Sequence, residues 1–194
     1  MSKSDPAKER NKTIRWVVTV FLVTIAVSGF ISLISDEIMS GSGIVTAFAI
    51  LLIIVLIGIV FDIVGVAVTS AHEKPFHSMA ARKVPGAQDA IRLLRNAERV
   101  SSICCDVVGD ICGVVSGSAS ATIAAQVLAR IECGWPQAVT LLMSAMVAGL
   151  TVGGKAVGKT IAMASATSIV HGVGRILFWL RHIPELFRKK KNKR

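Results

Sequence analysis

The sequence predicts an all-α, polytopic membrane protein with about four transmembrane helices and cytoplasmic, juxtamembrane amphipathic helices. Three observations lead to this class. The chain of 194 residues is 53% apolar, and its apolar residues gather in runs that reach the roughly 20 residues needed to cross a bilayer. The stretches between these runs are short and polar, which leaves no room for a separate soluble domain. The net charge of +10 is concentrated in alternate polar segments.

Four apolar runs are expected to form the spans of one membrane domain over residues 16–153. The first run holds no ionisable side chain, which is typical of an outer helix that faces lipid. It follows a basic segment and lacks a clear cleavage site after it, so we interpret it as a retained anchor. The fourth run is expected to end at the glycine pair Gly153-Gly154. The predicted spans cover residues 16–34, 44–70, 100–129 and 136–153.

The alternation of basic charge predicts the topology. Residues 1–15 hold five basic and two acidic side chains, whereas residues 36–43 hold two acidic side chains and no base. Residues 71–99 are basic again, and residues 154–194 carry ten basic side chains and one acidic one. Because Lys and Arg are retained on the cytoplasmic side, both termini and the central loop are expected in the cytoplasm. The basic tail is expected to lie on anionic lipid, and nucleic acid is not an expected partner.

Two segments outside the spans are predicted to form juxtamembrane helices. Pro85-Gly86 is a turn signal, and residues 87–100 place apolar side chains at helical spacing after it. With a second helix over residues 72–83, this predicts a helical hairpin within residues 71–99 on the inner leaflet. Residues 160–180 are expected to lie along the inner face. The alternative, a fifth span, would place the basic C-terminus outside.

The third run contains residues that predict close helix packing. Gly109, Gly113 and Gly117 recur every four positions, so they stack on one side of a helix. Small residues allow a neighbouring helix to approach closely in lipid. Asp106 and Asp110 share that side of the helix. The third span is therefore expected at the centre of the bundle.

Three carboxylates within the apolar runs form a candidate ion site. A charge at the bilayer centre costs roughly 2.5–3.5 kcal/mol, so Asp62, Asp106 and Asp110 are expected to face the bundle interior. At about 1.5 Å per residue they lie roughly 10–17 Å from the inner surface and can meet at one level. Hydroxyl groups such as those of Thr69 and Ser116, with nearby carbonyl groups, would complete a set of hard oxygen ligands for Mg²⁺ or Ca²⁺.

Other interpretations of the charged residues stay open at this point. Lys155 or Lys159 could pair with one of the aspartates, which would make these charges structural. Residues 153–160 also match the phosphate-binding pattern G-x-x-x-x-G-K-[ST]. Nucleotide hydrolysis is not predicted from this match, because no parallel sheet is predicted around it and Glu185 is the one acidic residue downstream. An enzyme is not predicted, because the sequence offers no matched nucleophile and base.

Residues 61–162 resemble the transmembrane domain of the cyclin-M and CorC-type magnesium transporters. Residues 61–70 look like the family's first motif, and a basic hairpin follows as it does in the family. Asp106 and Asp110 are similar in spacing to the family's paired asparagines. Lys155 stands where the family's Gly-Glu-x-x-Pro-Lys motif has its glutamate. The resemblance implies a homodimer with Mg²⁺ held between the spans, and the chain leaves no length for the family's CBS-pair domain.

These patterns together predict a divalent-cation transport domain of the Mg²⁺ type in the cell membrane. In this interpretation the three aspartates attract the cation, and Lys155 gates the route by competing with it. The alternative is a non-transporting membrane scaffold or regulatory subunit of the same fold. In that case the aspartates and lysines pair with each other, and the glycine stripe packs against a partner protein.

Overall fold

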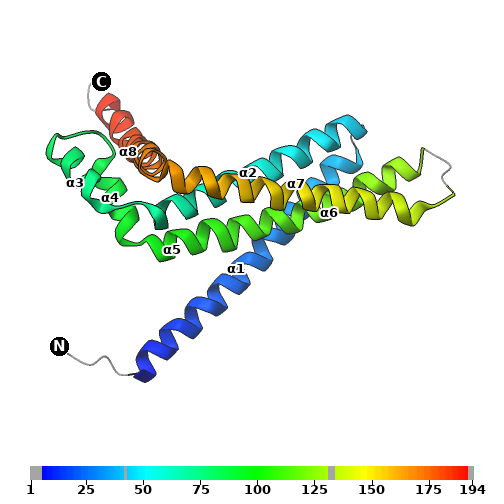
Figure 1. The fold of residues 1–194 in the computed structure, drawn as a ribbon, viewed down its shortest axis with the longest axis horizontal. Coiled ribbons are helices and arrows are strands. Elements are labelled where there is room, and N and C mark those ends of the chain that lie inside the picture. The colour runs from blue at the N-terminus through cyan, green and yellow to red at the C-terminus, as the bar shows by residue number, and fades with distance from the viewer. Residues whose placement is uncertain (1–5, 42, 131–133, 192–194) are drawn as a thin grey trace. The chain divides into compact units, whose positions relative to one another are not determined.

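The structure is entirely helical over the residues that it describes (Figure 1). It is a computed structural model that describes residues 6–41, 43–130 and 134–191; for residues 6–13, 36, 39–40 and 182–191 it describes the backbone alone. The all-α class predicted from the sequence is confirmed. In chain order the elements are α1 (Pro6–Ser40), α2 (Ile44–Ser70), α3 (Glu73–Ala81), α4 (Ala87–Arg95), α5 (Ala97–Ser101), the π-helix η1 (Ser102–Val108), α6 (Gly109–Leu128), α7 (Pro136–Ala164) and α8 (Ala166–Lys191).

Four helical stretches are long and apolar enough to cross a membrane, judged by length and composition. They fall on the four predicted apolar runs, so the prediction of about four spans is confirmed at this level. The third stretch begins a few residues earlier than predicted, and the fourth extends well beyond its predicted end. The four stretches are Ile14–Ser35, Ile44–Ser70, Ala97–Leu128 and Pro136–Ala164.

The helix break predicted at Gly153-Gly154 is wrong, because α7 continues through both glycines to Ala164. A Cβ atom built on Gly154 would collide with the side chain of Ile59 on α2. A Cβ atom built on Gly158, one turn later, would lie 2.8 Å from Cγ1 of Ile63. The missing side chains therefore let α7 approach α2 closely, and the backbone hydrogen bonds of α7 keep it helical.

The chain divides into two compact units. The first comprises Met1–Leu56 and Asp110–Ala148, and the second comprises Ile57–Gly109 and Gly149–Arg194. Each unit thus combines segments that are far apart in the sequence, and α2 and α7 each contribute to both.

The first unit contains α1, whose apolar side chains form a long exposed surface. Apolar side chains of α1 are largely exposed, with Phe21 at 63% and Leu33 at 72%. This agrees with the predicted outer, lipid-facing helix, because so long an apolar surface is unfavourable in water. In α6, by contrast, Val115, Ala119 and Ile123 are buried at intervals of four residues, so one side of this helix is covered.

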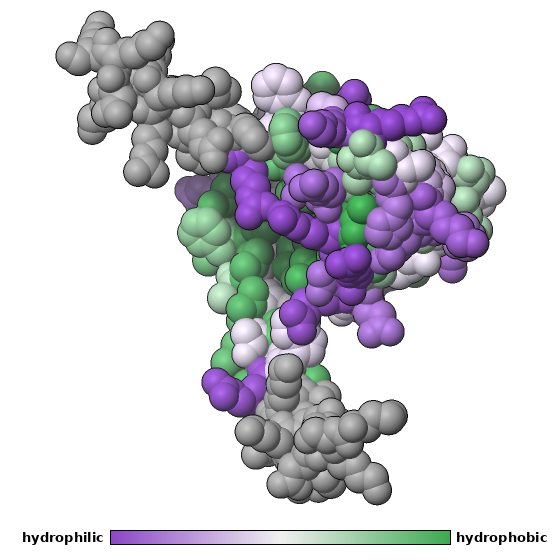
Figure 2. All heavy atoms as spheres, turned by 90° about the vertical axis from the view of Figure 1, so that its left-hand side faces the viewer, coloured by the Kyte–Doolittle hydropathy of each residue, from purple (hydrophilic) through white to green (hydrophobic). Residues whose placement is uncertain are grey.

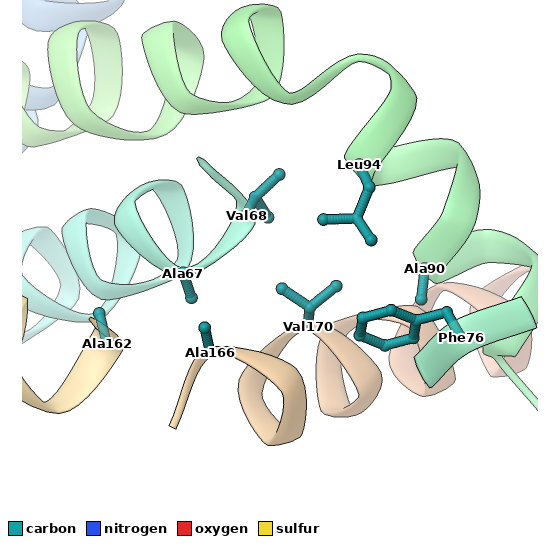
Figure 3. Packing of buried hydrophobic residues seen from close by; sticks show 8 residues of the cluster. All are labelled: Ala67, Val68, Phe76, Ala90, Leu94, Ala162, Ala166 and Val170. Carbon is teal, nitrogen blue, oxygen red and sulfur yellow. The ribbon is translucent and has the colours of Figure 1, made fainter. Parts of the chain in front are cut away.

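The second unit is built around a small apolar core (Figure 3). Its buried side chains come from α2, α3, α4 and α8, and from the C-terminal end of α7. Phe76 of α3 is the largest of them and is fully buried, whereas half of the core positions are alanine. Small side chains at the contacts let the helices come close together, and the Phe76 ring fills the remaining space. The core consists of Ala67, Val68, Phe76, Ala90, Leu94, Ala162, Ala166 and Val170.

The helices predicted on either side of Pro85-Gly86 are present as α3 and α4. The end of α3 is closed by hydrogen bonds from the amides of Lys83 and Val84 to carbonyl groups of the last helical turn, at 2.9 and 3.0 Å. This cap places Lys83 in the left-handed region, with φ of 56°. The predicted helix over residues 87–100 is interrupted at Asn96, whose side-chain amide donates to the Arg92 carbonyl oxygen at 2.9 Å.

Helix α8 packs against α4, so it covers the hairpin. It follows α7 through a bend at Ser165, where the Ser165 amide still donates to the Ile161 carbonyl oxygen at 2.9 Å. At the closest point of α4 and α8, a Cβ atom on Gly174 would lie 2.5 Å from the carbonyl oxygen of Gly86. The four candidate spans of the described chain do not include α8.

Candidate ion site at a π-helical turn

The third candidate span contains a π-helical segment, η1, between α5 and α6. In a π-helix each amide bonds to the carbonyl five residues earlier, which widens the turn. Such segments are rare in proteins as a whole, and those that occur often lie at functional sites. Asp106 lies in η1 with an exposed side chain. The wide turn also changes the angular relation between Asp106 and Asp110, which the sequence analysis placed on one face by assuming a regular α-helix.

Helix α2 meets η1 at Gly65. A Cβ atom built on Gly65 would collide with Sγ of Cys105 and would lie 3.2 Å from Cβ of Cys104. The Cys105 thiol donates to the carbonyl oxygen of Asp62 at 3.7 Å. The sequence neighbour of Asp106 therefore touches the backbone of Asp62, whose own side chain is half-buried.

Lys155 of α7 reaches the end of η1. Its ammonium nitrogen lies 3.5 Å from the carbonyl oxygen of Gly109, and the side chain is half-buried. A carbonyl oxygen has two lone pairs, so it can accept from an ammonium group beside its helical amide. A Cβ atom on Gly109 would lie 3.4 Å from this nitrogen, so the glycine leaves room for Lys155.

The ion pairs that would make the charges purely structural are not observed. Over the residues that the structure describes, neither Lys155 nor Lys159 forms an ion pair with Asp62 or Asp106. Lys159 is exposed on α7. The ammonium group of Lys155 contacts a backbone carbonyl oxygen, that of Gly109.

The predicted hydroxyl ligands bond to their own helices. The hydroxyl of Thr69, in the second unit, donates to the Val66 carbonyl oxygen at 2.9 Å. The hydroxyl of Ser116, buried in the first unit, donates to the Gly113 carbonyl oxygen at 2.9 Å. Both oxygens keep lone pairs that can accept or bind a cation. Asp110 lies in the first unit with an exposed side chain.

The glycine stripe of the third span is not used as predicted within the described chain. Cβ atoms built on Gly113 and Gly117 would meet nothing within 4 Å. The glycines that bring α2 close to η1 and to α7 are Gly65, Gly154 and Gly158. The four-residue spacing of Gly154 and Gly158 is typical of close helix packing in membranes and was a usable signal in the sequence.

Among the residues that the structure describes, a metal site made of acidic, histidine or cysteine side chains alone is not found. In the described ranges no three such side chains form a group that could hold a metal ion. A cation at η1 would therefore need carbonyl oxygens, hydroxyl groups or water besides one or two carboxylates. Mg²⁺ accepts such a set, because it usually keeps several of its own water molecules.

Comparisons with protein-family models, with curated proteins and with solved structures find no match to this chain. The class of the protein therefore follows from the length and hydropathy of its helices alone. It is a candidate multi-pass membrane protein with four helices able to span a bilayer by length and hydropathy.

Proposed function

We propose that this protein carries a divalent cation of the Mg²⁺ type across the cell membrane, with both termini in the cytoplasm. The observation that carries the proposal is the position of Asp106 in a π-helical turn inside a candidate span. Ionisable side chains within spans are energetically costly and usually mark an ion path or a charge pair. Among the described residues, Asp106 forms no ion pair, which favours the ion path over the charge pair.

The surroundings of η1 supply further oxygen atoms for a hydrated cation. Asp62 lies on α2, which contacts η1 through Cys105. The Gly109 carbonyl oxygen already attracts one positive group, the ammonium of Lys155. An arriving divalent cation would compete with that ammonium, because two positive charges in a site of low dielectric repel strongly. Lys155 is therefore proposed as the gate of the route.

A homodimer is part of the same proposal. The open side of the third span at Gly113 and Gly117 supports it, since small residues there would admit a second helix at close range. Residues 182–194 of the basic tail are proposed to lie on anionic lipid, and their side chains fall outside those that the structure describes.

The transport proposal is tested by growth rescue of cells that lack their own Mg²⁺ uptake. The unaltered chain is expected to restore growth at low Mg²⁺, whereas Asp106→Asn and Asp110→Asn are expected to abolish rescue. Glu98→Gln is the matched control, because Glu98 is an exposed carboxylate at the very start of the third candidate span. Equal amounts of folded protein in the membrane must be shown for every variant. Rescue that is indifferent to both aspartates would refute the proposal.

A non-transporting scaffold is the second candidate, and the position of Lys155 favours it. An ammonium tethered at the Gly109 carbonyl can act as a permanent substitute for a mobile cation. The change Lys155→Gln separates the two functions. A transporter should show an altered rate or altered Mg²⁺ dependence of rescue in this variant. A scaffold should show no rescue with either the unaltered chain or the variant.

A further inference from the structure

A cavity of about 420 Å³ lies in the second unit, between the α3–α4 turn and α8. Its walls include three basic side chains, Lys83, Arg92 and Arg181, and one acidic side chain, Asp89. Three cations and one carboxylate leave two positive charges in excess. Figure 2, which looks toward α3 and α4, shows hydrophilic side chains gathered on this face beside apolar ones. The charge balance suits an anionic ligand.

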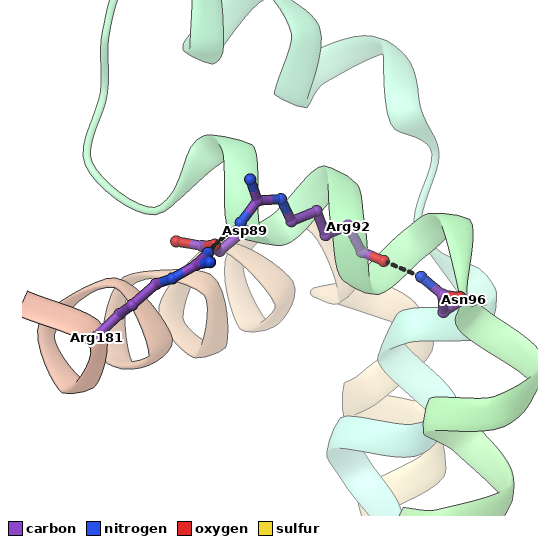
Figure 4. Close-up of polar contacts among 4 residues, drawn as sticks. All are labelled: Asp89, Arg92, Asn96 and Arg181. Atoms are coloured by element: carbon purple, nitrogen blue, oxygen red, sulfur yellow. Dashed lines mark hydrogen bonds and ion pairs between the residues drawn. The ribbon is translucent and has the colours of Figure 1, made fainter.

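Asp89 holds both arginines in place (Figure 4). One of its oxygens, Oδ1, lies 3.2 Å from Nη1 of Arg92 and 3.7 Å from Nη1 of Arg181. The Asp89 side chain is only 14% exposed, whereas those of Arg92 and Arg181 are 60% and 67% exposed. Each guanidinium carries five N–H donors in a planar fork. Most of these donors are left over for a phosphate group, which arginine recognises with two parallel hydrogen bonds.

The turn between α3 and α4 places the backbone of Lys83 and the start of α4 at the cavity. Lys83 has φ of 56°, a conformation in which glycine is the usual residue. Helix α4 begins at the cavity with Gly86, which supplies no side-chain cap. The first-turn amides and the positive end of the helix dipole add to the attraction for an anion.

An apolar groove of about 530 Å³ continues from the cavity and shares Asp89, Arg92 and Arg181 with it. A free phosphate ion would occupy the polar cavity and leave this groove empty. An amphiphile with a charged head and an acyl chain would fill both. The apolar walls of the groove are Leu93, Val100, Leu177 and Leu180.

The cavity also lies close to the start of a candidate span. Arg92 precedes Ala97, where the third candidate span begins, by five residues, with the end of α4 at Arg95 between them. Lipid headgroups lie at the ends of membrane spans, so a ligand site next to the start of this span can meet them. We propose that the cavity binds the phosphate headgroup of an anionic phospholipid and that the adjoining groove holds one of its acyl chains. This proposal does not depend on ion transport.

The test uses the full chain in a neutral detergent, with bound lipid counted by native mass spectrometry. The probes are dioctanoyl phosphatidylglycerol, dioctanoyl phosphatidylcholine and inorganic phosphate. One molecule of phosphatidylglycerol is expected to bind per chain. Its affinity is expected to be at least roughly tenfold higher than that of phosphatidylcholine, because phosphatidylcholine carries no net charge to match the cavity. Inorganic phosphate at equal concentration is expected not to displace it, because phosphate gains nothing from the apolar groove.

Two variants remove the basic groups. Arg92→Gln combined with Arg181→Gln is expected to weaken phosphatidylglycerol binding by roughly 25-fold, at about fivefold for each base lost. Lys83→Gly is expected to weaken it by about fivefold. The second variant also relieves the strained backbone at Lys83, so its unfolding temperature should not fall even if the double variant folds poorly.

The matched control is Lys74→Gln combined with Arg82→Gln, which removes two exposed bases of the same unit that line neither the cavity nor the groove. Its affinity for phosphatidylglycerol is expected to change by less than about twofold. Equal losses in the control and the cavity variants would overturn the proposal in favour of general attraction by surface charge. Equally tight binding of phosphatidylcholine would overturn it too. Displacement by inorganic phosphate would assign the cavity to a free anion instead.

Discussion

Two glycines of α8, only two positions apart, meet very different surroundings. A Cβ atom on Gly174 would press on the Gly86 carbonyl oxygen at 2.5 Å and on Cβ of Ala90 at 3.0 Å. A Cβ atom on Gly172 would meet nothing within 4 Å. Because the atoms around Gly174 belong to the backbone and to a rigid methyl group, they cannot give way by a side-chain rotation.

Gly174→Ala is therefore expected to lower the free energy of unfolding by about 1–3 kcal/mol, through overpacking at the contact of α4 and α8. Gly172→Ala should leave stability unchanged or raise it by up to about 1 kcal/mol, because alanine favours the helix. Both variants are measured by thermal unfolding of the purified protein in detergent. Equal unfolding temperatures for the two would contradict the close approach at Gly174.

At the scale of elements, the hairpin of α3 and α4 is joined to the rest of the second unit through Phe76 of α3 and through the packing of α4, with Ala90 and Leu94, against the core and α8. Phe76 is fully buried in the core, and Arg95 of α4 lies 3.9 Å from Glu73 of α3. The ion pair is exposed and contributes little. Burial of the Phe76 ring is therefore the main contribution of α3 to the docking of the hairpin.

Phe76→Ala is expected to destabilise the docked hairpin by about 3–5 kcal/mol, because it leaves a cavity in a tight core. Backbone amides of α3 and α4 should then exchange with solvent much faster, as followed by hydrogen exchange with mass spectrometry. His77→Ala, a change at an exposed neighbour on the same helix, serves as the control. Unchanged exchange in Phe76→Ala would show that the hairpin is held by other contacts.

Elements differ in how far the sequence reveals them. The long apolar runs predicted the spans, and Pro85-Gly86 predicted the turn between α3 and α4, because both signals are local. The π-helical turn around Asp106 was missed, since bonding to the fifth carbonyl leaves no residue pattern. The continuation of α7 through Gly154 was missed because it depends on Ile59, a residue from a distant part of the chain.

At the scale of the whole molecule, the four candidate spans and the distribution of basic residues together carry the proposed topology. In the proposed topology, an even number of spans would place both termini on one side, and the basic segments predict that this side is the cytoplasm. The candidate site follows from the sequence only in part. Asp62 and Asp106 lie on α2 and η1, which are in contact through Cys105, but the side chain of Asp106 is exposed and does not face inward as expected. The Gly109 carbonyl partner of Lys155 could not be predicted, because it depends on the packing of α7.

Reporter fusions test this topology directly. A reporter that is active only outside the cytoplasm is expected to be active when fused after Gly41 and inactive when fused after Pro85 or at the C-terminus. The physical reason is the acidic charge of residues 36–43 against the basic charge of the other two segments. Activity at the C-terminus would mean that α8 crosses the membrane as a fifth span.

The central claim is that a cation passes the π-helical turn at Asp106, and flux into sealed vesicles tests it most directly. The purified full chain is placed in vesicles that contain a Mg²⁺-sensitive dye. We predict Mg²⁺ uptake well above that of protein-free vesicles, a fall of at least roughly tenfold in Asp106→Asn, and full uptake in Glu98→Gln. Uptake no greater than in protein-free vesicles, or equal uptake in Asp106→Asn, would contradict the claim.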